Sequence, residues 1–333
     1  MTSEHSQKQT NRNIIHHMKQ KLLYLFTRTP LHVGAGSSVG AIDQPIIRER
    51  HTGFPIIPAS SLKGTFADVW NDDLLPDGDC KVRVTTKKNE KNEEVIDGVA
   101  EAAWLFGSDN AKHAFAGALQ FSEARLLAFP IRSAKGSFAW ITCPLMLRRA
   151  ARDGVIPLAK LDKLTEPADE KAIFDAGAAS KLALGDKVVL EEYTFQIATP
   201  GWLGLSNLGE CLAGLLPADE IWKEIASRLV ILSDGMMSFF AQNACEVAQH
   251  VRISDETGTA EGGALFNQEN VPGETLFYSL LHASDSRHKA GEHGGKKSAD
   301  ALAAIGSKVK ETSVFQFGGD ASTGLGYCTV ILS

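Results

Sequence analysis

The sequence lacks several features that would assign it to a common class of protein. Its five cysteines form no Cys-x-x-Cys pair, which argues against a disulfide framework and against a zinc ribbon. It contains no run of about 18 uncharged apolar residues, and its first residues include no apolar stretch followed by a small-residue cleavage site. We therefore expect a soluble, cytoplasmic protein that has no membrane partner.

The chain also lacks an excess of positive charge. Its 34 Lys and Arg against 40 Asp and Glu give a formal net charge of −6. Binding to nucleic acid through bulk charge needs many Lys and Arg contacts to phosphate. The composition therefore argues against a protein that coats nucleic acid through its overall charge, but it does not exclude a local basic groove. Three segments concentrate basic residues: Arg48, Arg50, His51 and Lys63; Arg125, Arg132 and Lys135; and Arg148 and Arg149. Solvated surface faces are the alternative interpretation of each.

Apolar residues are abundant, at 44% of the chain, which predicts a substantial core and excludes global disorder. Residues 1–19 are polar and have no apolar period, so we expect a disordered leader there. Residues 20–333 are predicted to form a single domain. Strands and helices alternate without a strict βαβ repeat, which favours an α+β fold.

The first elements of this domain are a strand and a helix. The apolar run Lys21–Thr29 predicts a buried strand. Ser60 and Ser61 offer an N-cap for a following helix. Lys63 is then expected in the first turn, where a phosphate group would meet free backbone N–H groups and an ammonium together. A solvated lysine is the alternative.

Three later segments have distinct patterns. Residues 71–100 contain a charged stretch typical of a surface excursion, and we expect a separate flap. Residues 218–233 have a helical apolar period. Two β-rich runs flank the turn-rich sequence DETGTAEGG, which predicts a protruding hairpin at about residues 247–268.

The glycine-rich loop from His32 to Asp43 has an unusual context. A dinucleotide-binding loop must open a helix, whereas here Asp43 is followed by an extended segment with Pro45, so we reject that interpretation. What remains is a loop with exposed amides that ends in one carboxylate and is followed by basic residues. This composition suits phosphate contact. Capping of the turn before Pro45 is the alternative role of Asp43.

Two other patterns do not support a chemical role. His282, His288 and His293 fit no standard zinc spacing, and we expect no metal there. The sequence around Ser206 has the wrong glycine spacing for a nucleophile elbow, so no serine hydrolase is predicted.

The segment FGGDASTGLGY near the C-terminus concentrates glycine around Asp320. Such density is needed where the backbone approaches a ligand or another chain closely. A glycine-rich hairpin end is the alternative.

Taken together, these segments resemble a known family. The stretch TPLHVGAGSSVGAIDQPIIRERHTGFPIIPASSLKG is similar almost throughout to the pattern of the backbone subunit of type III-B CRISPR (Cmr) complexes, in the RAMP superfamily. The segments GALQFSEARLLAFP, DETGTAEGGALF and GGDASTGLGY follow in the family order. The resemblance covers nearly the whole chain after the leader.

The resemblance implies a ferredoxin-like, RRM-like palm with a β-hairpin thumb inserted at about residues 247–268 and a fingers or flap insertion at residues 71–100. It implies binding to crRNA and target RNA in an antiviral complex, with other copies of the chain in a helical filament and with other Cmr subunits. It further implies cleavage of the target at regular intervals. A non-catalytic scaffold subunit and a sibling RAMP subunit of a related type III complex are the alternatives.

The resemblance also assigns site residues. The catalytic aspartate of the family maps onto Asp43, and His32 matches a nearby family histidine. We expect Asp43 to anchor a divalent metal, Mg²⁺ or Mn²⁺, and direct action of Asp43 as a base is the alternative. The resemblance implies a 2′,3′-cyclic phosphate product. The expected RNA-binding residues are Gly36, Ser37, Ser38, Arg48, Arg50, His51, Ser60, Ser61, Lys63, Arg252, Gly318, Gly319, Gly324 and Gly326. The family often has paired acids and a tyrosine before the closing proline of the thumb, where this chain has Gln268, Glu269 and Asn270.

Overall fold

The computed structural model describes residues 19–36, 41–108, 113–161, 164–174, 181–198, 207–287 and 293–333. The predicted leader lies outside these residues, apart from Lys19, which begins the first strand. No helix in the described ranges is long and apolar enough to span a membrane.

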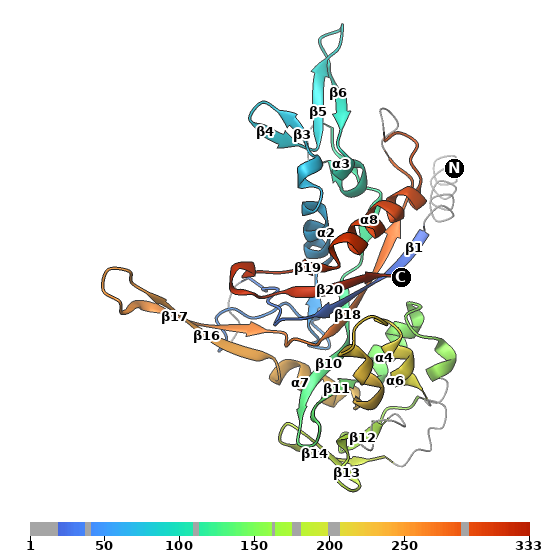
Figure 1. Ribbon diagram of the computed structural model, residues 1–333, viewed down its shortest axis with the longest axis vertical. Helices are drawn as coiled ribbons and strands as arrows, with labels where there is room; N and C mark the ends of the chain where they lie inside the picture. The colour runs from blue at the N-terminus through green and yellow to red at the C-terminus, as the bar shows by residue number, and fades with distance from the viewer. Residues whose placement is uncertain are drawn as a thin grey trace, which may run out of the picture.

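One twelve-stranded sheet organises the fold (Figure 1). Its main path is, in spatial order, β11 (Ser137–Thr142), β15 (Leu229–Ile231), β12 (Lys171–Phe174), β14 (Tyr193–Ile197), β13 (Lys187–Leu190), β10 (Ala124–Ser133), β18 (Leu276–Ala283), β1 (Lys19–Thr27), β20 (Tyr327–Leu332) and β19 (Val314–Gln316). β2 (Ile56–Ile57) pairs with β10, and β9 (Leu119–Phe121) pairs with β18. The predicted mixed α and β class is confirmed.

Six of these strands close into a ring. β11 pairs with β15 at one side and with β10 at the other, and β13 returns to β10 through the pair Ser133 and Leu190. Closure leaves these strands without a free edge. The ring was not predicted from the sequence, because β15 has only three residues and pairs with β11 and β12, which lie far from it along the chain.

The predicted helix at residues 218–233 forms only in part. This stretch forms the 3₁₀ turn η3 (Trp222–Ser227) and then strand β15. Leu229, Val230 and Ile231 are all buried in succession, which a strand between two covered faces permits. Tertiary burial therefore overrides the apparent helical period.

Helices cover both faces of the sheet. They are α2 (Ala59–Asp68), α3 (Glu101–Phe106), α4 (Pro144–Arg152), α6 (Leu208–Ala213), α7 (Asp234–Asn243) and α8 (Ser298–Thr312). β1 divides the two layers: Leu23 and Leu25 pack in the core with α2, α3 and α8, whereas Tyr24 and Phe26 pack in the core with α4 and α6. Burial on both faces explains the unbroken apolar run that predicted this strand.

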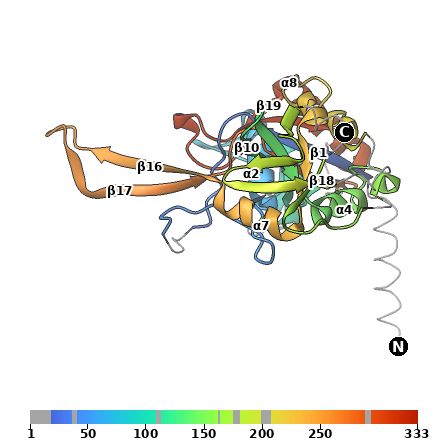
Figure 2. The same ribbon diagram turned by 90° about the horizontal axis from the view of Figure 1, so that it is seen from below.

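Two regions project from the body (Figure 1). The first, which Figure 2 shows from below, is the long antiparallel hairpin β16 (Glu246–Ile253) and β17 (Ala260–Asn270), called the thumb from here on. The second, called the flap, consists of β3 (Leu75–Asp77), β4 (Cys80–Val82), β5 (Val84–Lys88) and β6 (Glu94–Val99). Shorter elements are η1 (Asn71–Asp73), β7 (Gly107–Ser108), β8 (Phe115–Ala116), η2 (Leu158–Leu161) and η4 (Ala321–Thr323).

Glu274, just before β18, is a strained point of the fold. Its φ of 65° places a non-glycine residue in the left-handed region. Its Oε2 atom is buried and has no hydrogen-bond partner among the described residues. Burial, and then the nearby Asp219, raise the pKa of the Glu274 carboxyl to about 7, while Arg28 lowers it only in part. Ionisation of this carboxyl therefore destabilises the folded state.

We expect Glu274→Gln to stabilise the protein by about 1 kcal/mol at about pH 8, after allowance for partial exposure. The folded pKa lies above the unfolded value of 4.5, so native stability falls as the pH rises through that window. At about pH 3 the carboxyl is neutral in nearly all molecules of both states, and the gain should nearly vanish. Thermal melting at the two pH values measures this difference, and an equal gain at both would contradict the assignment.

Candidate functional site

The base of the thumb holds the loop that carries Asp43. The Asp43 side chain is exposed, and its Oδ2 atom accepts a hydrogen bond from the backbone N of Asn267 at 2.8 Å. Next to it, Gln44 pairs with Gln268 in a parallel bridge. The Asp43 carboxylate therefore binds β17 across the fold, and this contact does not match the alternative of capping a local turn. The Asp43 carboxylate lies at the base of the thumb, where the hairpin joins the body.

His32 is held by the same strand. Its Nδ1 atom lies 2.7 Å from the carbonyl oxygen of Glu269. Because a carbonyl only accepts hydrogen bonds, Nδ1 carries a proton in this arrangement, which leaves Nε2 as the second ring nitrogen available for proton exchange. The side chain is 7% exposed. His32 and Asp43 form no hydrogen bond with each other within the described residues, but β17 positions both.

The C-terminal glycine loop packs against His32. The backbone N of Gly319 donates to the His32 carbonyl at 2.9 Å. Gly318 has a φ of 77°, and a Cβ there would lie only 2.0 Å from the same carbonyl oxygen. Gly326 has a φ of 79°, and a Cβ there would meet the carbonyl of Phe317 at 2.0 Å. Close approach of the chain to itself therefore explains Gly318 and Gly326 without an RNA contact.

Gly324 and Asp320 are the more accessible parts of this loop. Gly324 has a φ of 89°, and a Cβ added there would have no described atom within 4 Å. Asp320 is exposed and accepts a hydrogen bond from the side chain of Gln268. β17 thus contacts the Asp43 loop, His32 and the glycine loop with three consecutive residues, 267–269.

Arg48 is committed to internal contacts. Its guanidinium forms an ion pair with Glu269 at 2.5 Å, and the two side chains are 18% and 5% exposed. It also donates to the carbonyls of Gly53 and Ala241, each at 2.7 Å. These contacts favour a structural role over the predicted phosphate contact. The pairing joins residues 221 positions apart in the chain, which the sequence did not reveal.

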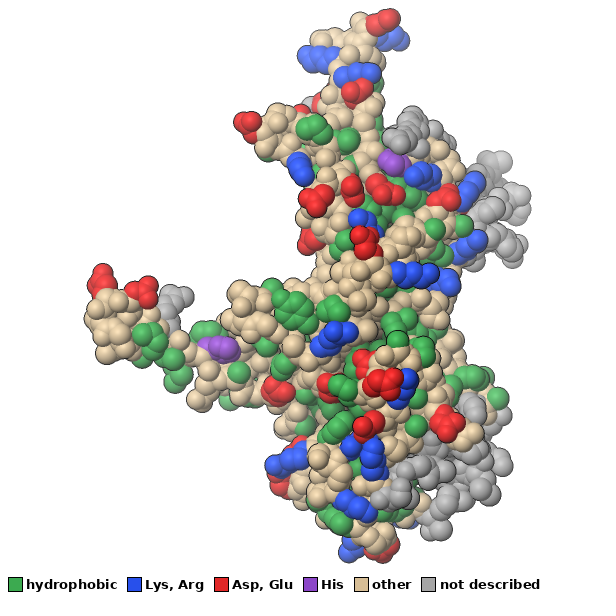
Figure 3. Space-filling model, in the orientation of Figure 1, with side chains coloured by type: hydrophobic (Ala, Val, Ile, Leu, Met, Phe, Trp, Pro, Cys, Tyr) green, Lys and Arg blue, Asp and Glu red, His purple; other side chains and the backbone are tan. Residues whose placement is uncertain are grey.

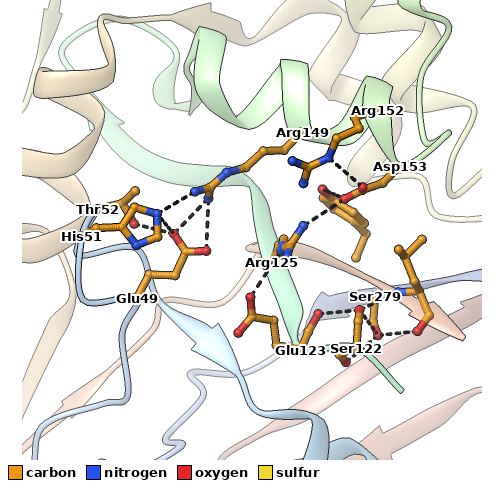
Figure 4. Close-up of polar contacts among 12 residues, drawn as sticks. Glu49, His51, Thr52, Ser122, Glu123, Arg125, Arg149, Arg152, Asp153 and Ser279 are labelled. Carbon is orange, nitrogen blue, oxygen red and sulfur yellow. Dashed lines mark hydrogen bonds and ion pairs between the residues drawn. The ribbon is translucent and has the colours of Figure 1, made fainter. Parts of the chain in front are cut away.

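The next residues point outward. Arg50 is exposed, and its side chain has no hydrogen bond or ion pair in the described part of the chain. His51 is exposed too, but its Nε2 atom accepts from Arg149 at 3.0 Å and lies 3.7 Å from Glu49 (Figure 4). Of these two residues, Arg50 is therefore the one whose side chain is available to contact a phosphate.

The start of α2 differs from the prediction. The helix begins at Ala59 and its N-cap is Pro58, with no side-chain cap hydrogen bond, so the predicted capping by Ser60 or Ser61 is wrong. Lys63 is exposed but lies past the first turn.

A cavity of about 440 Å³ adjoins this helix start. Ser60 and Lys63 line it together with Arg83 from the flap and Arg287 from the loop after β18, and the described lining residues include no carboxylate. An anion would be stabilised by these three cations. Arg83 and Arg287 were not predicted as binding residues, because both lie far along the chain from the glycine-rich motif. Only their positive charge pointed to a role in anion binding.

The other basic clusters are paired internally (Figure 4). Arg125 contacts Glu123 at 3.3 Å and Asp153 at 3.1 Å. Arg149 contacts Glu49 at 2.9 Å. The remaining pairs are Arg132 with Glu191 and Glu192, Lys135 with the Ala183 carbonyl, and Arg148 with the Leu164 carbonyl. These residues stabilise the body, which favours the solvated or structural interpretation of both clusters.

Several predicted residues fall outside the described part of the chain. They are Ser37, Ser38, the side chain of Arg252, and His288 of the histidine-containing segment in which no metal was expected. Gly36 is described: it is exposed, has a φ of 95° and has open space at its Cβ position.

Comparison with known proteins assigns the chain to a family. The model of the RAMP superfamily matches residues 25–329. The chain belongs to the RAMP superfamily. This RAMP protein is 33% identical over 318 residues to the CRISPR system Cmr endoribonuclease Cmr4 of Pyrococcus furiosus, an alignment that covers 95% of this chain and 96% of the relative. The resemblance inferred from the sequence motifs is confirmed.

Solved structures agree with this assignment. The fold is similar to oligomeric Cmr4 from Pyrococcus furiosus, with a TM-score of 0.62 and 25% identity over 95% of this chain and 98% of that chain. A chain of the type III-B Cmr-beta complex bound to cognate target RNA gives a TM-score of 0.63 at 18% identity over 95% and 98% of the two chains. At that identity the second likeness concerns the fold alone.

Asp43 is the carboxylate of this RAMP protein that is predicted to hold the metal. No group of three or more His, Cys, Asp or Glu within the described residues is arranged to hold an ion. Mg²⁺ commonly uses one or two carboxylates and completes its shell with water and substrate phosphate. The exposed Asp43 therefore fits an ion shared with RNA, and it does not fit an ion held by protein ligands alone.

Proposed function

We propose that this RAMP protein is the backbone subunit of a type III-B CRISPR complex, binds crRNA along its length, and cleaves complementary target RNA at regular intervals through Asp43. One observation carries the proposal: the exposed Asp43 carboxylate is fixed at the foot of the projecting thumb by Asn267. The relative in Pyrococcus furiosus, named a Cmr endoribonuclease, supports it. A cytoplasmic location, where the RNA partners are, belongs to this proposal.

The ferredoxin-like palm belongs to this proposal too. The adjacent strands β10, β18, β1 and β20 are antiparallel neighbours in that order. Along the chain, α2 lies between β1 and β10, and α8 lies between β18 and β20. Two crossover helices around four antiparallel strands in this order support a palm related to the RNA-recognition fold.

The thumb supplies an apolar surface for RNA bases or for another copy of the chain. Val247, Val251 and Leu265 on its strands are about half exposed or more, and register pairs Val251 with Leu265 on one face. His250 and Phe266 stack at 5.1 Å between ring centroids. Figure 3 shows hydrophobic side chains along the thumb and acidic ones at its tip. An isolated hairpin with such a face suits insertion between partners.

RNA contains the nucleophile of the proposed reaction. The 2′-hydroxyl attacks the adjacent phosphorus once it is aligned in line with the leaving oxygen, so the protein must bend the strand and assist proton transfer. The thumb would bend the strand next to Asp43. Asp43 would accept the proton of the 2′-hydroxyl, the bond from phosphorus to the 5′-oxygen would break as the new bond forms, and the 5′-oxygen would take up a proton. Nε2 of His32, which β17 holds as it holds Asp43, is the ring nitrogen suited to proton exchange. The product is a 2′,3′-cyclic phosphate.

A divalent ion fits beside Asp43 as an additional group. Mg²⁺ or Mn²⁺ would be held by the Asp43 carboxylate and by phosphate oxygens of the bound RNA. When bound, it would offset the negative charge on the scissile phosphate. Arg50, Lys63, Arg83 and Arg287 are the exposed or cavity-lining cations that we assign to the RNA backbone.

Metal removal tests the enzyme assignment against the alternative of a non-catalytic scaffold. Assembled complex containing this chain, its guide and the other subunits is incubated with end-labelled target, with and without EDTA. We expect evenly spaced fragments that EDTA abolishes and added Mg²⁺ or Mn²⁺ restores. Target binding without fragments under all conditions would favour the scaffold.

A further inference from the structure

Glu269 joins the thumb to the Asp43 loop through four contacts. Its Oε1 atom pairs with Arg48 at 2.5 Å, and its Oε2 atom accepts from the backbone N of Ile46 at 3.1 Å. Its backbone N donates to the Gln44 carbonyl at 2.9 Å, and its carbonyl meets Nδ1 of His32 at 2.7 Å. Both carboxylate oxygens and both backbone groups of one residue thus bind the segment 32–48.

Arg48 extends this connection to the other strand of the thumb. Its guanidinium donates to the Ala241 carbonyl in α7 at 2.7 Å and lies 3.3 Å from the Cys245 sulfur. Cys245 directly precedes β16. One guanidinium therefore holds the start of β16 and, through Glu269, the end of β17.

These contacts and the chain segments between them form a closed loop of covalent and non-covalent bonds that starts and ends at Asp43, called the circuit below. The chain runs from Asp43 to Arg48, the ion pair crosses to Glu269, β17 leads back to Asn267, and the Asn267 amide returns to Asp43. The two thumb strands form a sheet of their own, apart from the twelve-stranded sheet. A change in the angle of the thumb must therefore strain or break this circuit, and a charge-assisted contact in a buried place resists that change.

We propose that Arg48 and Glu269 are positioning residues that fix the thumb relative to the Asp43 carboxylate, so that the RNA linkage bent by the thumb arrives at Asp43. This inference rests on the proposed function. In this inference neither Arg48 nor Glu269 contacts RNA. The pair acts on the rate and on the place of cleavage, because a displacement of about 1 Å at a reacting centre costs about 100-fold in rate.

The test uses assembled complexes that contain Glu269→Gln. This substitution keeps the size of the side chain and an acceptor for the Ile46 amide, but removes the charge that holds Arg48. We expect single-turnover cleavage at saturating target to fall about tenfold or more, with cuts spread to neighbouring linkages. Guide binding and target binding should stay within about twofold of the wild type.

A second variant separates positioning from stability. Arg48→Met combined with Glu269→Leu replaces the pair by apolar side chains of similar length, which commonly preserves folding. We expect this double variant to melt close to the wild type and to bind target, but still to cut slowly and at scattered positions. Wild-type rate and cut positions in either variant would overturn the inference.

Asp153→Asn is the matched control. It breaks the ion pair with Arg125, in which the Asp153 side chain is 9% exposed (Figure 4), at the end of α4 and away from the thumb. We expect a lower melting temperature with unchanged cleavage rate and positions, and an equal slowing in this control would overturn the inference. If Asp43→Ala complexes still cut, the proposed function fails; if they are inactive while Glu269→Gln cuts normally, only the positioning role fails.

Discussion

Assembled complexes that contain Asp43→Ala are expected to lose target cleavage by about 100- to 10,000-fold, the range contributed by a positioned proton-transfer group. Guide and target binding should persist, because the cations that we assign to the RNA backbone, Arg50, Lys63, Arg83 and Arg287, are unchanged. The loss follows from the position of this carboxylate at the foot of the thumb, exposed and held by Asn267. Single-turnover cleavage of labelled target, together with binding measured by gel shift, separates the two effects.

Two further variants test the cause of that loss. Asp43→Asn retains an oxygen that accepts from the Asn267 amide, so the loop should keep its position while the charge is absent. It should be nearly as inactive as Asp43→Ala. Asp72→Ala removes a fully exposed carboxylate near the flap and should leave cleavage unchanged. Normal cutting by Asp43→Asn would show that charge at this position is not required.

Gly318→Ala is expected to destabilise the protein by about 3 kcal/mol and to displace His32. A Cβ at this position would lie 2.0 Å from the His32 carbonyl, and the backbone φ of 77° disfavours a side chain in any case. Since the backbone fixes the position of the Cβ and the atom that it meets is a backbone carbonyl oxygen, no rotamer change relieves the clash. Urea unfolding followed by circular dichroism measures the loss.

Gly324→Ala is the control for backbone conformation alone. Its φ of 89° is also left-handed, but no described atom lies within 4 Å of the added Cβ. We expect a loss of about 1 kcal/mol, typical of a non-glycine residue in this conformation. Equal losses in the two variants would show that the contact with His32 is not tight.

The parts of the fold predicted from the sequence are those with strong local signals. The apolar run of β1 is continuous because both of its faces are buried, and the helix predicted near Ser60 and Ser61 is present as α2, with Leu62 and Phe66 on its buried side. The thumb was visible as two β-rich runs around glycines. Asp43 was singled out by the motif, since its residue type and spacing alone left turn capping open.

The remainder depends on contacts between distant segments. Arg48 was interpreted as an RNA-binding residue because the sequence does not show Glu269 folding back onto it from 221 positions away. The closed ring of strands was missed for the same reason, since β15 has only three residues and a helix-like context. Arg83 and Arg287 join Lys63 only through folding of the flap and of the loop after β18.

The most direct test of the account uses complexes assembled from wild-type and Asp43→Ala chains mixed in known ratios, with the cut positions mapped along a labelled target. If each copy cuts one linkage through its own Asp43, every band should weaken in proportion to the fraction of variant, while the spacing between bands stays constant. Undiminished bands from complexes in which every copy carries Asp43→Ala would contradict the account.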